Sequence, residues 1–229
     1  NGKKYQKTTE IPNHKVGLEL VAGYLLDSKI GVITSQDDID AVGHRVVHGG
    51  STFTKTVIID AAVKAKIRDL FRLAPLHNPA NLEGILVAES IFTKAKQIAV
   101  FDTAFHQTIP SEAYKYGIND KFLKEHQIRM YGFHGTSHKY VTEKAREALG
   151  NQKSKKIISI HLGNGCSITA IKDGKSIDHS LGFAPMNGLI MGTRCGDIDP
   201  SVVLYLMDSL GYSLKETSNL LQKESGMFG

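Results

Sequence analysis

Three strand-like segments joined by short turns lie in the second half of the chain, and they constrain the fold more than any other feature. Residues 156–161 and 167–171 are rich in β-branched side chains, which favour strands. Leu162-Gly163-Asn164-Gly165 separates these two segments, and Lys172-Asp173-Gly174-Lys175 leads into a third strand. Because connections this short join antiparallel neighbours, the sequence predicts a β-meander in this region.

Strands and helices alternate in the first half of the chain. Residues 56–59 predict a strand, after which Asp60 is placed to cap a helix. Asn78 and Pro79 predict a second helix start, with Asn78 as the cap. Residues 97–101 form a further apolar strand. This alternation is typical of βα units.

The two patterns together predict an α/β fold with mixed sheets flanked by helices. A chain of 229 residues is long enough for two domains. We place the boundary so that residues 1–104 are part of an N-terminal domain and residues 105–229 are part of a C-terminal domain. Near the end of the chain, Asp199 is expected to start one helix, and Ser213 with Glu216 forms a capping box for the last one.

The composition narrows the class of ligand. The net charge is +5 without a basic stripe, which favours small anions and gives no indication of nucleic acid. The apolar runs are too short to span a bilayer and no leader segment opens the chain, so a cytoplasmic protein without a membrane partner is expected. Cys166 and Cys195 lack metal-type or redox-type spacing and are expected to be reduced.

Three glycine-containing segments carry candidate binding residues. Arg45 precedes the pair Gly49-Gly50, and Arg194 lies in a glycine-bounded loop before a helix start. Gly163-Asn164-Gly165 fits either an ordinary hairpin turn or a backbone surface for phosphate. A lone arginine is commonly a surface or connecting residue, but two of them supply the planar donors that neutralise phosphoryl oxygens.

Residues 131–138, Tyr-Gly-Phe-His-Gly-Thr-Ser-His, admit three interpretations. His134 and His138 are spaced like a metal pair, although no glutamate lies between them as in a zinc protease. Thr136 or Ser137 is expected to cap the helix that follows. His134, at the N-terminus of that helix, is placed to donate a hydrogen bond to a phosphoryl group. The segment therefore predicts phosphoryl transfer to a small anionic substrate.

These motifs resemble the acetate kinase family, the acetokinase group within the actin, Hsp70 and sugar-kinase superfamily. They occur in the family's order, and the similarity extends over essentially all 229 residues. The motifs are residues 44–50, 101–106, 131–138, 161–165 and 191–200. The resemblance implies the two-domain, ribonuclease H-like fold of that superfamily. It also implies transfer of the ATP γ-phosphate to acetate by direct in-line displacement, giving acetyl phosphate and ADP, with Mg²⁺ as cofactor.

The resemblance further implies roles for individual residues. Asp102, His134 and Arg194 would be catalytic, with Asp102 near the metal or the attacking oxygen. Arg45 and Arg194 would hold the carboxylate and the transferring phosphoryl group. The acetate methyl group would contact Val47, Leu76, Phe133 and Pro185. The ATP phosphates would contact His161, Leu162, Gly163, Asn164 and Gly165. The family is homodimeric, which predicts a homodimer.

Alternative functions stay open at this stage. Propionate or butyrate kinase is the nearest one, because one methylene in an apolar pocket changes binding by only ~1–3 kcal/mol. A non-catalytic module of the same fold is the second, although the presence of Arg45, Asp102, His134 and Arg194 together argues against it. A metal-dependent hydrolase that uses His134 and His138 is the third, and it would bind stoichiometric zinc.

The sequence departs from the family pattern in two ways. Cys166 and Cys195 stand where the family commonly has alanine and serine, and we expect both to be tolerated. The family's N-terminal phosphate hairpin has no counterpart before Asn1, and family members continue beyond Gly229 into the adenosine site and a magnesium-binding glutamate. We therefore expect these 229 residues alone to be an inactive fragment. Robust ATP- and acetate-dependent turnover by this polypeptide would contradict that expectation.

Overall fold

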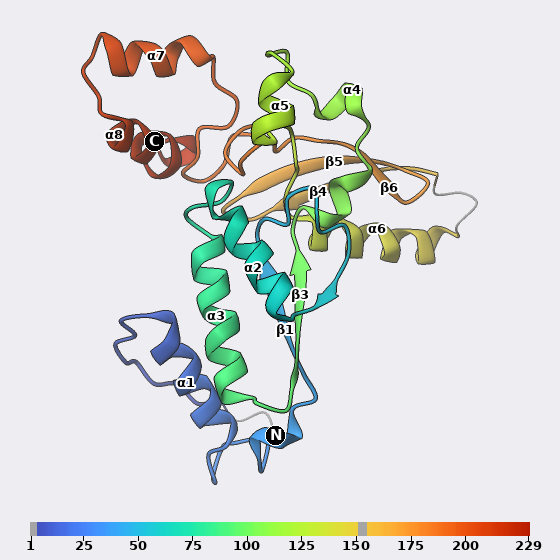
Figure 1. The fold of residues 1–229 in the computed structure, drawn as a ribbon, viewed down its shortest axis with the longest axis vertical. Helices are drawn as coiled ribbons and strands as arrows, with labels where there is room; N and C mark the ends of the chain where they lie inside the picture. The colour runs from blue at the N-terminus through green and yellow to red at the C-terminus, as the bar shows by residue number, and fades with distance from the viewer. Residues whose placement is uncertain (1–3, 151–154) are drawn as a thin grey trace. The chain divides into compact units, whose positions relative to one another are not determined.

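The computed structural model describes residues 4–150 and 155–229 as two compact units (Figure 1). Of the described residues, the first unit contains 4–46 and 57–100, and the second contains 47–56, 101–150 and 155–229. The short segment 47–56 therefore belongs with the later part of the chain. The predicted division into functional domains after residue 104 stays a prediction.

The first unit is a small sheet covered by helices. Its strands are β1 (Ala41–Val46), β2 (Val57–Ile58) and β3 (Lys96–Phe101), in the order β1-β3-β2, and β2 pairs antiparallel with β3. Its α-helices are α1 (His14–Leu25), α2 (Ala61–Asp69) and α3 (Asn78–Ile91), with short 3₁₀ turns η1 (Gln36–Asp38) and η2 (Leu70–Arg72). Helix α3 packs against α1, α2 and β1 (Figure 1). Its core is apolar, with Ile67 and Ile85 fully buried.

The helix starts of the first unit test the predicted caps. Asp60 caps α2 as expected, and its carboxylate accepts the Val63 N–H at 2.8 Å. The predicted cap at Asn78 was wrong, because His77 occupies the cap position of α3 and Asn78 is already the first helical residue. The helical turn starts before Asn78, because the Asn78 N–H already donates to the Ala74 carbonyl at 3.0 Å.

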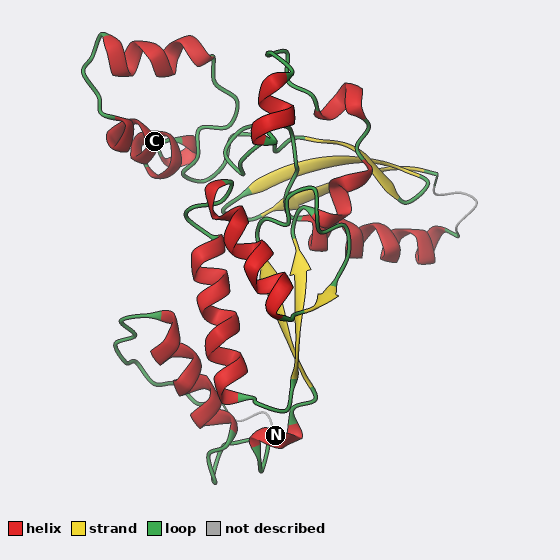
Figure 2. Cartoon of the chain, in the orientation of Figure 1, coloured by secondary structure: helices red, strands yellow, loops and turns green. Residues whose placement is uncertain are grey.

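The second unit is built on the predicted meander. Strands β4 (Lys156–Leu162), β5 (Cys166–Lys172) and β6 (Lys175–His179) form an antiparallel sheet in the order β4-β5-β6. Helix α6 (Gly135–Leu149) packs against β4, and η3 (Ala104–Thr108) packs against both β6 and α6 (Figure 2). The other helices are α4 (Ser111–Tyr114), α5 (Lys121–His126), α7 (Pro200–Asp208), α8 (Leu214–Lys223) and η4 (Gly226–Phe228).

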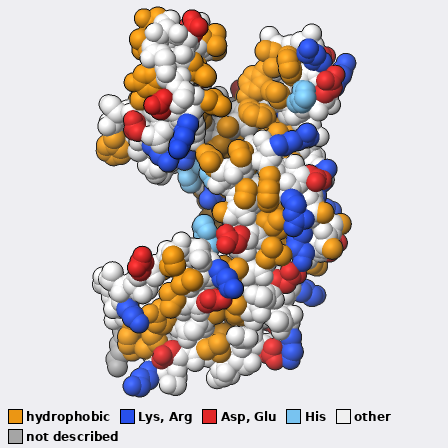
Figure 3. Space-filling model, turned by 60° about the vertical axis from the view of Figure 1, so that its left-hand side comes forward, with side chains coloured by type: hydrophobic (Ala, Val, Ile, Leu, Met, Phe, Trp, Pro, Cys, Tyr) orange, Lys and Arg blue, Asp and Glu red, His pale blue; other side chains and the backbone are white. Residues whose placement is uncertain are grey.

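The C-terminal helices begin where the sequence predicted. Asp199 caps α7, and Ser213 with Glu216 forms the capping box of α8. Hydrophobic side chains are visible on the surface of this C-terminal segment (Figure 3), and Leu204 of α7 is 67% exposed. Among the described residues, none of the helices combines the length and apolar character needed to cross a bilayer.

The start of α6 differs from the prediction. Neither Thr136 nor Ser137 is its cap, because the helix begins at Gly135 and His134 occupies the cap position. The Gly135 N–H donates instead to the backbone carbonyl of Asp102 at 2.9 Å. A Cβ atom on residue 135 would lie 2.2 Å from that carbonyl oxygen, so the close approach of the two backbones requires glycine.

Candidate active site

The segment from Tyr131 to His134 crosses the interior of the second unit. The side chains of Tyr131 and Phe133 are fully buried. The N–H groups of Tyr131 and Gly132 both donate to the Gly182 carbonyl, at 3.0 and 3.3 Å. These contacts fix the segment, and they hold the partly buried His134 at the N-terminus of α6.

His134 has a backbone conformation that is rare for its residue type. Its φ of 58° and ψ of 22° lie in the left-handed region, which is costly for residues other than glycine. Such a conformation persists only where its surroundings hold it. The N–H groups and the dipole at the start of a helix of 15 residues favour a negative charge nearby. His134 is therefore held at a point where an anion would be stabilised.

Hydrogen bonds through serine hydroxyls fix the imidazole of His134 to the sheet. Its Nδ1 lies 2.9 Å from the Ser167 hydroxyl, which also lies 2.8 Å from Nε2 of His138. His138 in turn contacts the Ser159 hydroxyl at 3.0 Å through Nδ1. The ring of His161 stacks on that of His134, with centroids 4.2 Å apart. His138 is thus a buried link between α6 and the sheet.

The metal-pair interpretation gains no support from this geometry. Both nitrogens of His138 face serine hydroxyls, and Nδ1 of His134 faces one of the same hydroxyls. In the part of the chain that is described, no three side chains of histidine, cysteine, aspartate or glutamate gather as metal ligands would.

Gly165 is the point where the predicted phosphate hairpin, His134 and Arg194 meet. A Cβ atom on Gly165 would lie 3.3 Å from Nη1 of Arg194 and 3.3 Å from Cε1 of His134. The guanidinium is half-buried and donates to the Pro185 carbonyl through Nη1 at 2.6 Å. The Gly192 N–H of the same loop donates to the Asn164 carbonyl at 3.2 Å. Three segments that the sequence placed far apart are therefore in contact.

Asp102 is in contact with the start of α6 through its backbone carbonyl. Its side chain is almost fully buried at the end of β3, and its carbonyl holds Gly135 as described above. The hydroxyl of the next residue, Thr103, accepts the Gly49 N–H at 3.0 Å. The glycine pair after β1 is thus joined to the segment after β3 through a threonine hydroxyl, and the start of α6 is joined to the same segment through backbone groups.

An apolar cluster accompanies these polar groups. Val47, Phe133, Leu181 and Met191 pack together, and Cys166 contacts them. Val47 and Phe133 were predicted to line the substrate pocket. Leu181 and Met191 were not among the residues predicted for that pocket, because an apolar residue beside a glycine-containing loop has no distinguishing sequence signal.

The remaining predicted residues have different surroundings. Arg45 lies near the end of β1 in the first unit, two residues before Val47. Leu76 also belongs to the first unit, where it precedes α3 and is 68% exposed. In the second unit, Leu162 is exposed at the end of β4, and Pro185 is half-buried and held to Arg194 through its carbonyl.

Burial determines the charge of the groups around the site. It lowers the pKa of His48 and of His138 to about 4, and that of His106 to about 3. Burial likewise lowers the pKa of His179 and of Arg194. The imidazoles are therefore neutral at pH 7, whereas an arginine guanidinium stays protonated in proteins. Arg194 therefore carries a fixed positive charge, whereas His48, His106, His138 and His179 are neutral rings that can form hydrogen bonds.

This combination of an α/β fold, a glycine hairpin and a half-buried arginine near a helix N-terminus is typical of one class of protein. It is the actin, Hsp70 and sugar-kinase-like fold, and the closely similar solved structures share it. The sequence pattern described as the Acetokinase family matches residues 1–229. The chain belongs to the acetokinase family.

Individual relatives agree with this assignment. The chain is 61% identical over 225 residues to the acetate kinase of Flavobacterium johnsoniae, covering 98% of this chain and 57% of the relative. It is 47% identical to the solved acetate kinase of Porphyromonas gingivalis, with a TM-score of 0.88, covering 95% of this chain and 55% of that one. A solved propionate kinase from Francisella tularensis is 50% identical, with a TM-score of 0.86, covering 93% and 54%. The chain thus spans just over half the length of these relatives.

The buried histidines predict how stability depends on pH. In the folded state His48 and His138 take up a proton only near pH 4, whereas in the unfolded state they do so near pH 6.5. The unfolded state therefore binds more protons between these values. We expect the free energy of unfolding to be highest above about pH 6.5 and to fall toward pH 4, by up to about 1.4 kcal/mol per pH unit for each such histidine.

Chemical denaturation at a series of pH values measures this dependence. His138→Gln should reduce the slope of unfolding free energy against pH between pH 6.5 and pH 4, because it removes one imidazole whose pKa is lowered by folding. His126→Gln, at an exposed position on α5, is the matched control and should leave the slope unchanged. Equal slopes for the unsubstituted protein and His138→Gln would contradict the expectation.

Proposed function

We propose that the whole protein is an acetate kinase that transfers the ATP γ-phosphate reversibly to acetate, giving acetyl phosphate and ADP. The observation that carries the proposal is the meeting of Arg194, His134 and Gly165 at the N-terminus of α6. Identity of 61% to a curated acetate kinase over nearly the whole chain supports it.

The chemistry needs positioned charge more than it needs a reactive side chain. A carboxylate oxygen of acetate attacks the γ-phosphorus, and the bond to the bridging oxygen breaks with its electrons leaving on ADP. Negative charge is then spread over the three equatorial oxygens of the transferring group. In the proposal, Arg194 supplies a fixed positive charge to these oxygens and His134 donates a hydrogen bond to them. Neither group has to reorganise during transfer.

The acetate subsite of the proposal combines a cation with apolar walls. Arg45 binds the carboxylate, in the bidentate geometry that a guanidinium allows. The methyl group contacts the apolar residues Val47, Leu76, Phe133 and Pro185. Packing of Val47 and Phe133 with Leu181 and Met191 supports the apolar character of this subsite.

The nucleotide subsite of the proposal uses the β4–β5 turn. Backbone groups of residues 161–165 contact the ATP phosphates, and the glycines allow the close approach. Mg²⁺ is commonly held in proteins by one or two carboxylates together with substrate phosphates, so the buried carboxylate of Asp102 fits such a site. When bound, the ion neutralises charge on the β- and γ-phosphate oxygens. We further propose that the protein is cytoplasmic and homodimeric, as the sequence and its resemblance to the family imply.

Propionate kinase is the second candidate, because the solved propionate kinase of Francisella tularensis is about as similar to this chain as the solved acetate kinase of Porphyromonas gingivalis is. One extra methylene in an apolar pocket shifts binding by only ~1–3 kcal/mol. We expect kcat/KM of the whole protein to be higher for acetate than for propionate. Steady-state kinetics with both carboxylates measures the ratio of the two kcat/KM values. A clear preference for propionate would identify the protein as a propionate kinase instead.

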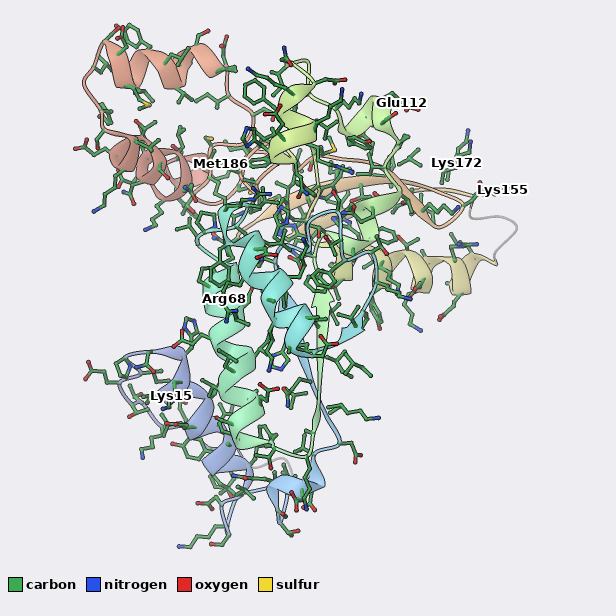
Figure 4. All side chains as sticks on the ribbon, viewed as in Figure 1. Lys15, Arg68, Glu112, Lys155, Lys172 and Met186 are labelled. Carbon is green, nitrogen blue, oxygen red and sulfur yellow. The ribbon has the colours of Figure 1, made fainter. Side chains whose placement is uncertain are left out.

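The role of Arg194 is tested by its removal. Arg194→Ala in the whole protein should lower kcat on the order of 10²–10³-fold, as expected when one charge-stabilising donor is lost. Arg68→Ala, an exposed arginine on α2 (Figure 4), is the control and should retain kcat. If Arg194→Ala raised KM and left kcat unchanged, Arg194 would bind ligand without stabilising the transition state.

A further inference from the structure

The backbone of Phe133 is held on both sides by buried imidazole rings. Its N–H donates to Nε2 of His179 at 3.1 Å, and its carbonyl oxygen lies 2.9 Å from Nε2 of His106. Both histidines are almost completely buried, His106 in η3 and His179 at the end of β6. Phe133 immediately precedes His134, so these two contacts act on the backbone that carries the candidate catalytic ring.

The two contacts require opposite tautomers. A backbone N–H can only donate, so Nε2 of His179 must carry the lone pair and its proton must lie on Nδ1. A carbonyl oxygen can only accept, so Nε2 of His106 must carry the proton. Each ring therefore has one specific neutral form.

Hydroxyl groups from the sheet match both tautomers. The protonated Nδ1 of His179 lies 2.7 Å from the Thr169 hydroxyl oxygen, which can accept. The unprotonated Nδ1 of His106 lies 2.9 Å from the Ser176 hydroxyl, which can donate. Burial lowers the pKa of His106 to about 3 and also lowers that of His179, which keeps both rings neutral.

Glycine at position 132 makes room for this arrangement. A Cβ atom there would lie 2.8 Å from Cγ of His106 and 2.9 Å from Cδ2 of His179. The two rings are themselves in contact, with centroids 4.1 Å apart and planes inclined by 30°. Gly132 also has a φ of 74°, so both the space and the backbone conformation require a residue without a side chain.

Hydrogen bonds hold the peptide groups on both sides of His134. The peptide group before His134 is held through the Phe133 carbonyl by His106. The peptide group after it is held through the Gly135 N–H by the carbonyl of Asp102. Since the φ and ψ of a residue are set by the orientation of its two flanking peptide groups, these contacts fix the left-handed conformation of His134.

We propose that His106 and His179 are positioning residues that clamp the Phe133 backbone and thereby hold the His134 imidazole in place for phosphoryl transfer, an inference that rests on the proposed function. Neither ring touches the transferring group. Their effect on catalysis passes through the geometry of His134, where a displacement of about 1 Å is enough to cost on the order of 100-fold in rate.

The tautomers are measured directly by NMR of the whole protein labelled with ¹⁵N in its histidine rings. We expect His106 to be protonated on Nε2 alone and His179 on Nδ1 alone at pH 7. Reversed tautomers, or a ring protonated on both nitrogens, would overturn the clamp. This measurement does not depend on enzymatic activity.

A double-mutant cycle tests the route through His134. His179→Leu should lower kcat on the order of 10- to 100-fold. In a His134→Ala background the same substitution should have almost no further effect, because the ring that it positions is absent. A general loss of folded protein would instead lower kcat by the same factor in both backgrounds, and that additive result would overturn the proposal.

Thr169→Val provides a milder variant in case His179→Leu does not fold. It removes the hydroxyl that selects the tautomer of His179 while keeping the shape of the side chain, so kcat should fall and the Nδ1 proton signal should change. Thr142→Val is the matched control, since Thr142 is equally buried in the second unit and its hydroxyl donates to the His138 carbonyl. An unchanged kcat in Thr169→Val would overturn the clamp.

The outcomes separate this inference from the proposed function. Expected tautomers together with an unchanged kcat in His134→Ala would reject the catalytic role of His134 in the proposed function, and with it the clamp's role in catalysis. Reversed tautomers together with a large loss of kcat in His134→Ala would reject the clamp and leave the proposed function standing.

Discussion

The hydrogen bond between the Gly135 N–H and the Asp102 carbonyl is the contact on which the candidate site depends. It joins the end of β3 to the start of α6 at a distance that only glycine permits. It also takes the place of a side-chain cap, so His134 occupies the cap position with a left-handed backbone. The helix N-terminus, the buried carboxylate and the imidazole are therefore brought together by one backbone contact.

Histidines perform different tasks in this unit because their surroundings differ. Buried rings such as His138 are neutral and connect one element to another through serine hydroxyls. His134 is only partly buried and, like the guanidinium of Arg194, it approaches Gly165. Neutral rings can be packed in the interior without uncompensated charge, so the positive charge of the site is concentrated on arginine. Residue type alone does not distinguish these roles.

Much of the fold could be predicted because its signals are local. The caps at Asp60 and Asp199 and the strands of the meander follow from a few neighbouring residues, and the structure confirms them. The cap predicted at Thr136 or Ser137 failed because a distant carbonyl, that of Asp102, took its place. The motif containing His106 was recognised, but its contact with the Phe133 carbonyl was not foreseen, since their 27-residue separation has no pattern.

The sequence by itself determined the order of the elements, the glycines at the close approaches and membership of the acetokinase family. Those features depend on short stretches of neighbouring residues and not on contacts between distant parts of the chain. Only the tertiary structure decided that Gly165, His134 and Arg194 meet, and which partner faces each ring nitrogen of His106 and His179. A tautomer is set by the donor or acceptor that folding places opposite the ring, and that partner lies elsewhere in the chain.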